Sequence, residues 1–249
     1  MTRKNAVTRK SGTHFEQVPL EEVVKRIAPD EVPKELRKGT DDPTTGPRPR
    51  KRQPSADSSH FHGVQFYNDR DALCRIVGSF LAEGLKQGDL AVIIATPDHA
   101  ARVESCLRSV GIDVDELKRQ GNLVTLDARD TLQLFMADGT PNPGTFRRVV
   151  GSALTRVCRG RDDCAIRAYG EMVDLLWKDG LEAAAIRLET LWNQLANSHD
   201  FKLLCGYSMG NFYKGAAIEE IHSQHSHLVG EDGRTTVLTD LETLSPAPL

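Results

Sequence analysis

From residue 60 onward, hydrophobic positions along the chain follow two different periods. Short apolar runs such as LAVIIAT, residues 90–96, are typical of buried strands. In RDALCRIVGSFLAEGLKQG, residues 70–88, apolar positions recur three and four apart, which indicates a helix with one buried stripe and Gly88 as its stop. Because strands and helices of this kind keep alternating, we predict a parallel sheet with helices on its faces.

The rest of this region repeats the pattern. Further strands are predicted at VQFY (64–67), NLVTLDA (122–128), CAIRAYGEM (164–172) and KLLCGYSM (202–209), with a weak edge strand at TTVLT (235–239). Further helices are predicted at 98–111, near 131–137, and at 145–160, 181–199 and 213–228. The economical fold is α/β: a doubly wound, mainly parallel sheet of five or more strands with helices on both faces.

The two ends of the chain differ from this body. Residues 1–59 are polar and rich in proline, so we predict a largely disordered arm with a short amphipathic helix near 18–28. That segment docks on the body or has no stable structure, or else it binds a partner. Residues 60–229 form the predicted globular domain, and residues 230–249 form a tail with the possible edge strand.

Charge narrows the class of partner. The arm carries 13 Lys/Arg against 9 Asp/Glu, whereas the rest of the chain carries 19 against 26. An acidic body argues against nucleic acid as the main partner, because phosphate neutralisation needs clustered cations. Only the basic run at residues 48–52 of the arm could contact DNA or RNA.

Composition also bears on location. No apolar run reaches the ~20 residues that a membrane span requires, and no signal-peptide pattern begins the chain. We therefore predict a cytoplasmic protein with no membrane partner. Its five cysteines form no C-x-x-C pair, and we expect them to be reduced and mostly buried.

The segment ATPDHAARVE, residues 95–104, follows a predicted strand at the place where many α/β proteins hold a phosphate. A phosphate loop there would need glycines and a Lys followed by Ser or Thr. Instead, Pro97 lacks an N–H and Asp98 would repel a phosphate. We interpret Thr96 or Asp98 as a helix cap with Pro97 in the first turn.

Four stretches of the chain match one known family: residues 61–114, residues 166–195, LLCGYSM (203–209) and IHSQHSHL (221–228). They resemble the MEDS domain, a sensory domain named after methanogens, methylotrophs and a dichloromethane-responsive regulator. The resemblance covers about residues 61–229. It implies a fold related to the KaiC and RecA ATPases without the phosphate loop, and a role as a sensor of small molecules in prokaryotic signalling.

A candidate ligand site lies at the carboxyl ends of the predicted strands. Strict alternation places Arg167, Tyr169 and Glu171 on one face of their strand, and Glu171 falls near the rim that carries Thr96. The predicted site takes polar contacts from Thr96, His99, Arg167, Tyr169 and Glu171, and an apolar wall from Met172 and Trp177. The alternative is that Arg167 pairs with Glu171 or with a helix and only orders the fold.

Histidines cluster at both ends of the body. His60 and His62 precede the first strand, while His222, His225 and His227 fall near the last helix. His222 and His225 are three apart, so they share a helical face and could share a transition metal. Surface polarity explains them equally well, and we predict no cofactor and no metal, keeping this pair as the candidate should one bind.

These observations favour a non-enzymatic sensory or regulatory protein. It would bind a small molecule of unknown identity and act on a signalling protein, such as a histidine kinase or a transcription regulator. It could assemble as a homo-oligomer. The alternative is a divergent nucleotide-binding ATPase of the RecA/KaiC type. The G-x-S-x-G match at Ser208 is weak evidence for a hydrolase, because the acid and histidine come in the wrong order.

Overall fold

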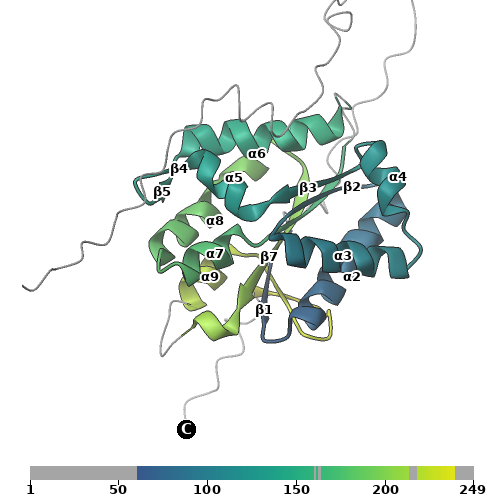
Figure 1. The fold of residues 1–249 in the computed structure, drawn as a ribbon. Helices are drawn as coiled ribbons and strands as arrows, with labels where there is room; N and C mark the ends of the chain where they lie inside the picture. The colour runs from purple at the N-terminus through teal and green to yellow at the C-terminus, as the bar shows by residue number, and fades with distance from the viewer. Residues whose placement is uncertain (1–60, 160, 162–163, 213–217, 239–249) are drawn as a thin grey trace, which may run out of the picture.

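The computed structural model describes residues 61–159, 161, 164–212 and 218–238 (Figure 1). The predicted arm at residues 1–59, with its helix near 18–28, lies outside the described residues, as do His60 and residues 239–249 of the tail. In the part that is described, no helix is both long and apolar enough to cross a bilayer.

Seven strands of the described chain form one sheet in the order β3-β2-β6-β7-β1-β8-β9. They are β1 (His62–Tyr67), β2 (Leu90–Ala95), β3 (Leu123–Asp127), β6 (Ile166–Gly170), β7 (Phe201–Ser208), β8 (His227–Val229) and β9 (Thr235–Val237). All neighbours pair in parallel except β8 and β9, which are antiparallel. The predicted α/β fold with a mainly parallel sheet is confirmed, whereas the relation to KaiC and RecA stays a prediction.

The helices fill the connections between these strands. They are α2 (Arg70–Gln87), α3 (Pro97–Ser109), α4 (Val114–Arg119), α5 (Ala128–Phe135), α6 (Pro143–Cys158), α7 (Met172–Lys178), α8 (Glu182–Ala196) and α9 (Ile218–Gln224), with a 3₁₀ turn at Met209–Asn211. A small hairpin of β4 (Met136–Ala137) and β5 (Thr140–Pro141) precedes α6. The short helices α4 and α7 were not predicted, because six or seven residues show too little of a helical period.

The last predicted helix, at residues 213–228, is wrong in its C-terminal part. α9 ends at Gln224, and His227–Val229 form strand β8 instead. Gly63 of β1 pairs with His227, so this segment covers a strand that would otherwise leave its backbone groups unpaired. The predicted edge strand at 235–239 is present as β9, while residues 213–217 lie outside the described residues.

Helices cover both faces of the sheet, and each face has its own apolar core. α2 and α3 pack on one face, while α5, α6, α7 and α8 pack on the other (Figure 1). The first core contains Leu73, Val77, Leu81, Val103, Leu107 and the β2 residues Ala91 and Ile93. The second contains Phe146, Leu154, Trp177, Leu188, Trp192 and the β7 residues Leu203 and Tyr207. Successive β-strand residues therefore point into opposite cores, as the pleat requires.

Local signals fix where α2 and α3 begin and end. The Asp69 side chain accepts a hydrogen bond from the Asp71 amide and caps α2, and Gly88 ends this helix with φ 91°. Thr96 holds the N-cap position of α3 with Pro97 following it, although its side chain makes no capping bond. The predicted placement of Thr96 and Pro97 is confirmed, and the capping chemistry is not.

The strand order reverses between β2 and β6, which lie side by side. β2 continues into α3 on one face of the sheet, whereas β6 continues into α7 on the other. The two connections therefore diverge at the carboxyl ends of these strands. Open α/β sheets bind their ligands in the crevice that such a divergence leaves.

The prediction that all five cysteines are reduced is wrong for two of them. Cys158, the last residue of α6, forms a disulfide with Cys164, and their Cα atoms are 5.6 Å apart. This Cα–Cα distance falls in the usual range for disulfides. Cys74, Cys106 and Cys205 are free.

Candidate functional site

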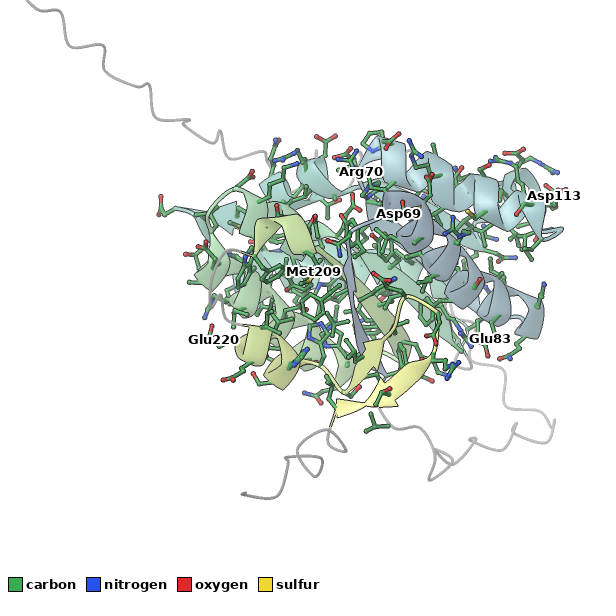
Figure 2. All side chains as sticks on the ribbon, turned by 90° about the horizontal axis from the view of Figure 1, so that it is seen from below. Asp69, Arg70, Glu83, Asp113, Met209 and Glu220 are labelled. Carbon is green, nitrogen blue, oxygen red and sulfur yellow. A yellow bond between two sulfur atoms is a disulfide. The ribbon has the colours of Figure 1, made fainter. Side chains whose placement is uncertain are left out.

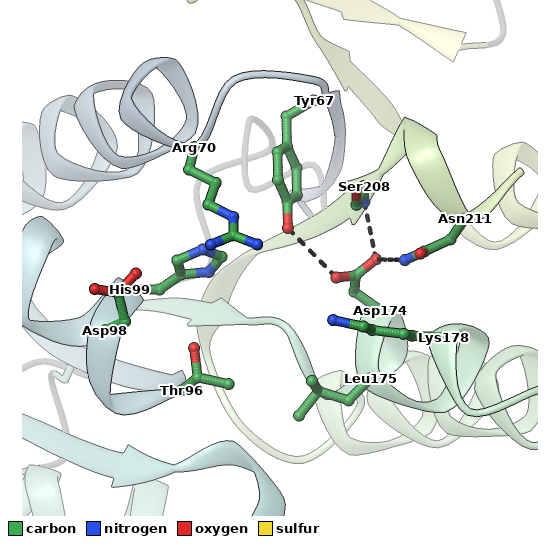
Figure 3. A pocket seen from close by; sticks show the side chains of 10 residues that line it. All are labelled: Tyr67, Arg70, Thr96, Asp98, His99, Asp174, Leu175, Lys178, Ser208 and Asn211. Atoms are coloured by element: carbon green, nitrogen blue, oxygen red, sulfur yellow. Dashed lines mark hydrogen bonds between the residues drawn. The ribbon is translucent and has the colours of Figure 1, made fainter.

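A pocket of about 160 Å³ opens at the carboxyl ends of the central strands (Figure 3). We call it the rim pocket. It is lined by Tyr67, Arg70, Thr96, Asp98, His99, Asp174, Leu175, Lys178, Ser208 and Asn211. These residues come from the ends of β1 and β7, from the residue after β2, from the 3₁₀ turn, and from α2, α3 and α7. Because α3 follows β2 and α7 follows β6, the pocket lies at the strand-order reversal.

Glu171 forms the inner support of the rim pocket. Its Oε1 accepts a hydrogen bond from the Thr96 amide, and its Oε2 lies 2.5 Å from Nδ1 of His99. The Tyr169 hydroxyl donates to the same Oε2 at 3.1 Å. Glu171 is 2% exposed, so the connection after β6 is tied to the start of α3 by a carboxylate without access to water.

The protonation states of this pair follow from its contacts. The hydrogen bond to Glu171 raises the pKa of His99 above its usual 6.5, against the opposing effect of burial. Burial raises the pKa of Glu171, but the hydrogen bonds and charge of His99 and the Thr96 amide outweigh it, so its pKa is lowered below 4.5. The pair is therefore a buried imidazolium and carboxylate in mildly acidic solution.

Asp174, in the first turn of α7, forms the opposite wall of the rim pocket. Its Oδ1 accepts from the Ser208 amide and from the Asn211 side chain, both at 2.8 Å. Its Oδ2 accepts from the Tyr67 hydroxyl at 3.3 Å. Burial raises the pKa of Asp174 above 3.8, and burial with the nearby Asp174 charge raises the pKa of Tyr67. Neutral donors thus satisfy this carboxylate.

Two cations face the rim pocket from opposite sides. Arg70 begins α2, Lys178 ends α7, and both side chains point into the space between Thr96 and Asp174 (Figure 3). Among residues 61–159, 161, 164–212 and 218–238, no carboxylate lies within 4.0 Å of either cation. Asp98, the remaining acid of the pocket, pairs with Arg102 instead. The pocket therefore offers two uncommitted positive charges.

The structure separates Arg167 from the predicted site. Its guanidinium donates to Glu83 at 2.7 Å and to Asp89 at 3.3 Å, and it also donates to the Phe80 carbonyl. Glu83 and Arg70 lie at opposite ends of α2 (Figure 2). Arg167 is the second residue of β6, so it faces the far end of that helix even though it shares a strand face with Tyr169. The pairing of Arg167 with a helix was the alternative interpretation.

The two apolar residues of the predicted wall lie in the core. Met172 is 1% exposed within the α6–α8 core, and Trp177 packs against Tyr207 and Phe212. Neither lines the rim pocket, and the apolar contact there comes from Leu175. Of the predicted site residues, the structure brings Thr96, His99, Tyr169 and Glu171 together. It places Arg167, Met172 and Trp177 elsewhere.

The histidine pair proposed as a metal candidate is also rearranged. α9 ends before His225, so His222 and His225 do not share a helical face. His222 contacts the Phe66 ring, whereas His225 turns inward and lies 4.2 Å from His62, centroid to centroid. His225 thus belongs to a different cluster, together with residues of β1, β7 and α8.

Several residues of the rim pocket were missed from the sequence. Arg70, Asp174 and Lys178 belong to helices, where charged residues are ordinary, so their types carried no signal. Tyr67, however, ends a predicted strand and Ser208 is the next to last residue of another, and ligands bind at the carboxyl ends of parallel strands. Applying this rule to every strand would have found both residues.

A comparison with known families agrees with the extent of this domain. The family model described as MEDS, the methanogen/methylotroph, DcmR sensory domain, matches residues 61–226, more than half of the chain. No curated protein matches the chain. The matched range includes every residue of the rim pocket.

Proposed function

Because the chain belongs to the MEDS family of sensory domains, we propose that it is a non-enzymatic sensory protein that binds a small anionic metabolite in the rim pocket. It would act in the cytoplasm on a signalling partner, such as a histidine kinase or a transcription regulator. The single observation that carries this proposal is the pair of uncommitted cations, Arg70 and Lys178, pointing into one pocket (Figure 3).

The chemistry of the pocket supports an anion over a cation. Asp174 already accepts hydrogen bonds from three neutral donors, and Glu171 is paired with His99. The acids are thus satisfied within the protein, whereas the two cations are left for a ligand. A carboxylate or phosphate group between Arg70 and Lys178 would make charge-assisted hydrogen bonds to both.

The size of the pocket supports a small ligand rather than a nucleotide. Its volume of about 160 Å³ falls below the roughly 300–1,000 Å³ of sites that enclose drug-sized molecules. In addition, the Thr96 amide, which a phosphate loop would direct at a phosphate, donates to Glu171. A phosphate in that position would meet a buried carboxylate, and the resulting repulsion argues against the ATPase alternative.

The position of the cations suggests how binding would be sensed. Arg70 belongs to the α2 layer on one face of the sheet, and Lys178 to the α7 layer on the other. An anion held by both side chains would link the two helix layers across the carboxyl ends of the strands. A sensor needs a state that its ligand binds better, and the closer approach of these two helices would provide one.

Thermal unfolding with defined anions tests the proposal. The full chain is heated with sodium acetate, glycolate, inorganic phosphate or ATP, each against sodium chloride at equal ionic strength. We expect at least one small anion to raise Tm by about 5 to 10 °C at about 100 times its Kd. We expect ATP to raise Tm no more than inorganic phosphate does at the same concentration of phosphate groups.

Charge-neutral variants complete this test. Arg70→Gln with Lys178→Gln should abolish the rise in Tm, whereas Arg75→Gln with Lys202→Gln, exposed positions away from the pocket, should retain it. Equal shifts in both double variants would place anion binding elsewhere and contradict the proposal. If no small anion shifts the Tm of the wild type at millimolar concentration, the proposal is also contradicted.

A further inference from the structure

A second polar cluster lies inside the domain, apart from the rim pocket. His62 begins β1, Glu189 lies in α8, Cys205 lies in β7, and His225 follows α9. All four side chains are buried, and Glu189 is 0% exposed. One nitrogen, oxygen or sulfur atom of each residue lies within 4.8 Å of those of the other three. Four segments that are distant in the sequence thus meet in one buried cluster.

The distances in this cluster are close to those around a tetrahedral metal ion. Nε2 of His62 is 3.2 Å from Oε2 of Glu189 and 3.5 Å from Sγ of Cys205, and that sulfur is 3.5 Å from the same oxygen. With bonds of about 2.0–2.3 Å, the ligand atoms of a tetrahedral zinc site lie roughly 3.3–3.8 Å apart. Three of the four ligand atoms therefore already have suitable spacing.

Hydrogen bonds fix the histidine tautomers in the form that a metal needs. The Asn193 amide nitrogen donates to the Gln224 carbonyl at 2.8 Å, so the Asn193 oxygen must face Nδ1 of His62, which therefore carries the proton. Nδ1 of His225 lies 2.6 Å from the Ile221 carbonyl, which can only accept. In both neutral rings the lone pair is consequently on Nε2, the atom that faces the cluster.

Glu189 is oriented in a similar way. The Tyr207 hydroxyl donates to its Oε1 at 2.7 Å, which leaves Oε2 directed at His62 and Cys205. Residues that bind metals in proteins are commonly held by such outer hydrogen bonds, which set the direction of the ligand atom. Asn193, the Ile221 carbonyl and Tyr207 each have this relation to one member of the cluster.

One atom of the cluster is left without a hydrogen bond. Nε2 of His225 is fully buried and has no hydrogen-bond partner among the described residues, although it lies 3.4 Å from Oε1 of Glu189. A buried polar atom without a partner carries an energetic cost, because it has given up its hydrogen bonds to water. An ion at the centre of the cluster would remove this cost, because it would bind the lone pair directly.

We propose that His62, Glu189, Cys205 and His225 bind one divalent transition metal ion in a closed tetrahedral site, with zinc as the best match. Two imidazoles, a carboxylate and a thiolate are zinc ligands, and four protein ligands are typical of a structural site. The carboxylate and the thiolate together neutralise a divalent ion. The filled site therefore carries no net charge, as its complete burial requires.

The competing arrangement is a metal-free network in which a protonated histidine pairs with Glu189. Burial raises the pKa of Glu189, but the nearby His225 and His62 rings and the hydrogen bond of His62 outweigh it and lower that pKa. This network needs no ion, and Cys205 stays a thiol whose pKa burial raises well above 9.0. The two arrangements differ in the state of the Cys205 sulfur, which can be measured.

Cobalt spectroscopy distinguishes these arrangements without any variant. The full chain is purified without a polyhistidine tag, freed of metal with a chelator, and titrated with Co²⁺. We expect one equivalent to bind, with the strong visible bands of a tetrahedral site and a near-ultraviolet band from a thiolate ligand, and one equivalent of Zn²⁺ to abolish both. Folded protein, judged by circular dichroism, that takes up no cobalt would overturn the proposal.

Variants assign the site to these residues. Cys205→Ser should remove the thiolate band, whereas Cys74→Ser with Cys106→Ser, the other free thiols, should retain it. Asn193→Ala should weaken zinc binding by about 10- to 100-fold, because it releases His62 without removing a ligand. A thiolate band that survives Cys205→Ser in folded protein would also overturn the assignment. None of these results depends on anion binding in the rim pocket, so the two proposals fail separately.

Discussion

His99 and Glu171 form a buried pair in which Nδ1 of the histidine lies 2.5 Å from Oε2 of the carboxylate. The histidine belongs to α3 on one face of the sheet, and the glutamate precedes α7 on the other. The pair therefore joins two helix layers at the point where the strand order reverses. The charge state of the pair should therefore control how stably the two layers are held together at the carboxyl ends of β2 and β6.

The pair predicts a pH dependence of stability. The pKa of His99 is raised above 6.5, so its contribution is complete below about pH 6.5 and is lost as pH rises through the folded-state pKa. The pKa of Glu171 is lowered below 4.5, so its contribution is present above about pH 4.5 and is lost as pH falls further. The pair stabilises most between these limits.

We expect His99→Gln to lower the free energy of unfolding by about 3 kcal/mol near pH 6 and by less near pH 9. Urea unfolding across this range measures the difference. Arg70 lowers and Asp98 raises the pKa of His99, so His99→Gln and its control are compared with the wild type at one salt concentration. His199→Gln is the control, since its ring nitrogens face Thr155 and Ser198. A difference that stays constant with pH would contradict the charged pair.

Arg167 should matter for stability and not for ligand binding. Its side chain is buried and pairs with Glu83 and Asp89, so Arg167→Met removes both ion pairs and leaves the Phe80 carbonyl and the 19% exposed Asp89 without this donor. We expect a loss of about 1–3 kcal/mol in urea unfolding, with anion binding unchanged. Glu83→Gln should cost less than about 1 kcal/mol, because that carboxylate is 63% exposed. Lost anion binding with normal stability would return Arg167 to the ligand site.

The Arg167 side chain also leaves no room for a Cβ atom at Gly84 of α2. A Cβ atom at this position would lie 2.5 Å from Nε and 2.6 Å from Cδ of Arg167. We expect Gly84→Ala to destabilise the protein by about 1–3 kcal/mol, despite the roughly 1 kcal/mol that alanine normally gains in a helix. Gly144→Ala in α6 is the control, since its Cβ meets only Asn142 at 3.5 Å. Thermal unfolding that finds Gly84→Ala as stable as the wild type would contradict this packing.

The Cys158–Cys164 disulfide predicts a thiol count. Denatured protein should react with a thiol reagent at three cysteines before reduction and at five afterwards. Cys164→Ser should lower the free energy of unfolding by about 2 kcal/mol under non-reducing conditions, through the added freedom of the unfolded chain. Mass spectrometry of the labelled protein gives the count. Five reactive thiols without reductant would show that the disulfide is absent in solution.

The sequence predicted most of the fold because local periods determine local structure. Alternation and apolar runs located β1, β2, β3, β6 and β7, and the stripe of α2 gave its bounds, including Gly88. The strand order was beyond the sequence, since it depends on pairing between distant segments. β8 was missed for this reason: only its pairing with β1 makes His227–Val229 a strand.

The candidate site was predicted in part, and the error at Arg167 has a geometric cause. Alternation correctly placed Arg167 and Tyr169 on one face of β6. The two residues lie toward opposite ends of that strand, however, so their side chains meet different partners. Glu171 meets Thr96 because β6 lies beside β2, which the rule for carboxyl ends anticipates. His62 and His225 lie at opposite ends of the domain sequence, so no local pattern could bring them together.

The place of β1 in the sheet affects how the chain is made. The first strand of the described chain is held between β7 and β8, where Gly63 pairs with Leu204 on one side and His227 on the other. During synthesis, its neighbours leave the ribosome only after nearly all of the domain has been translated. Contacts this far apart in sequence slow folding and leave apolar strands exposed to aggregation. Nascent chains that stop before β7 should therefore depend on chaperones to stay in solution.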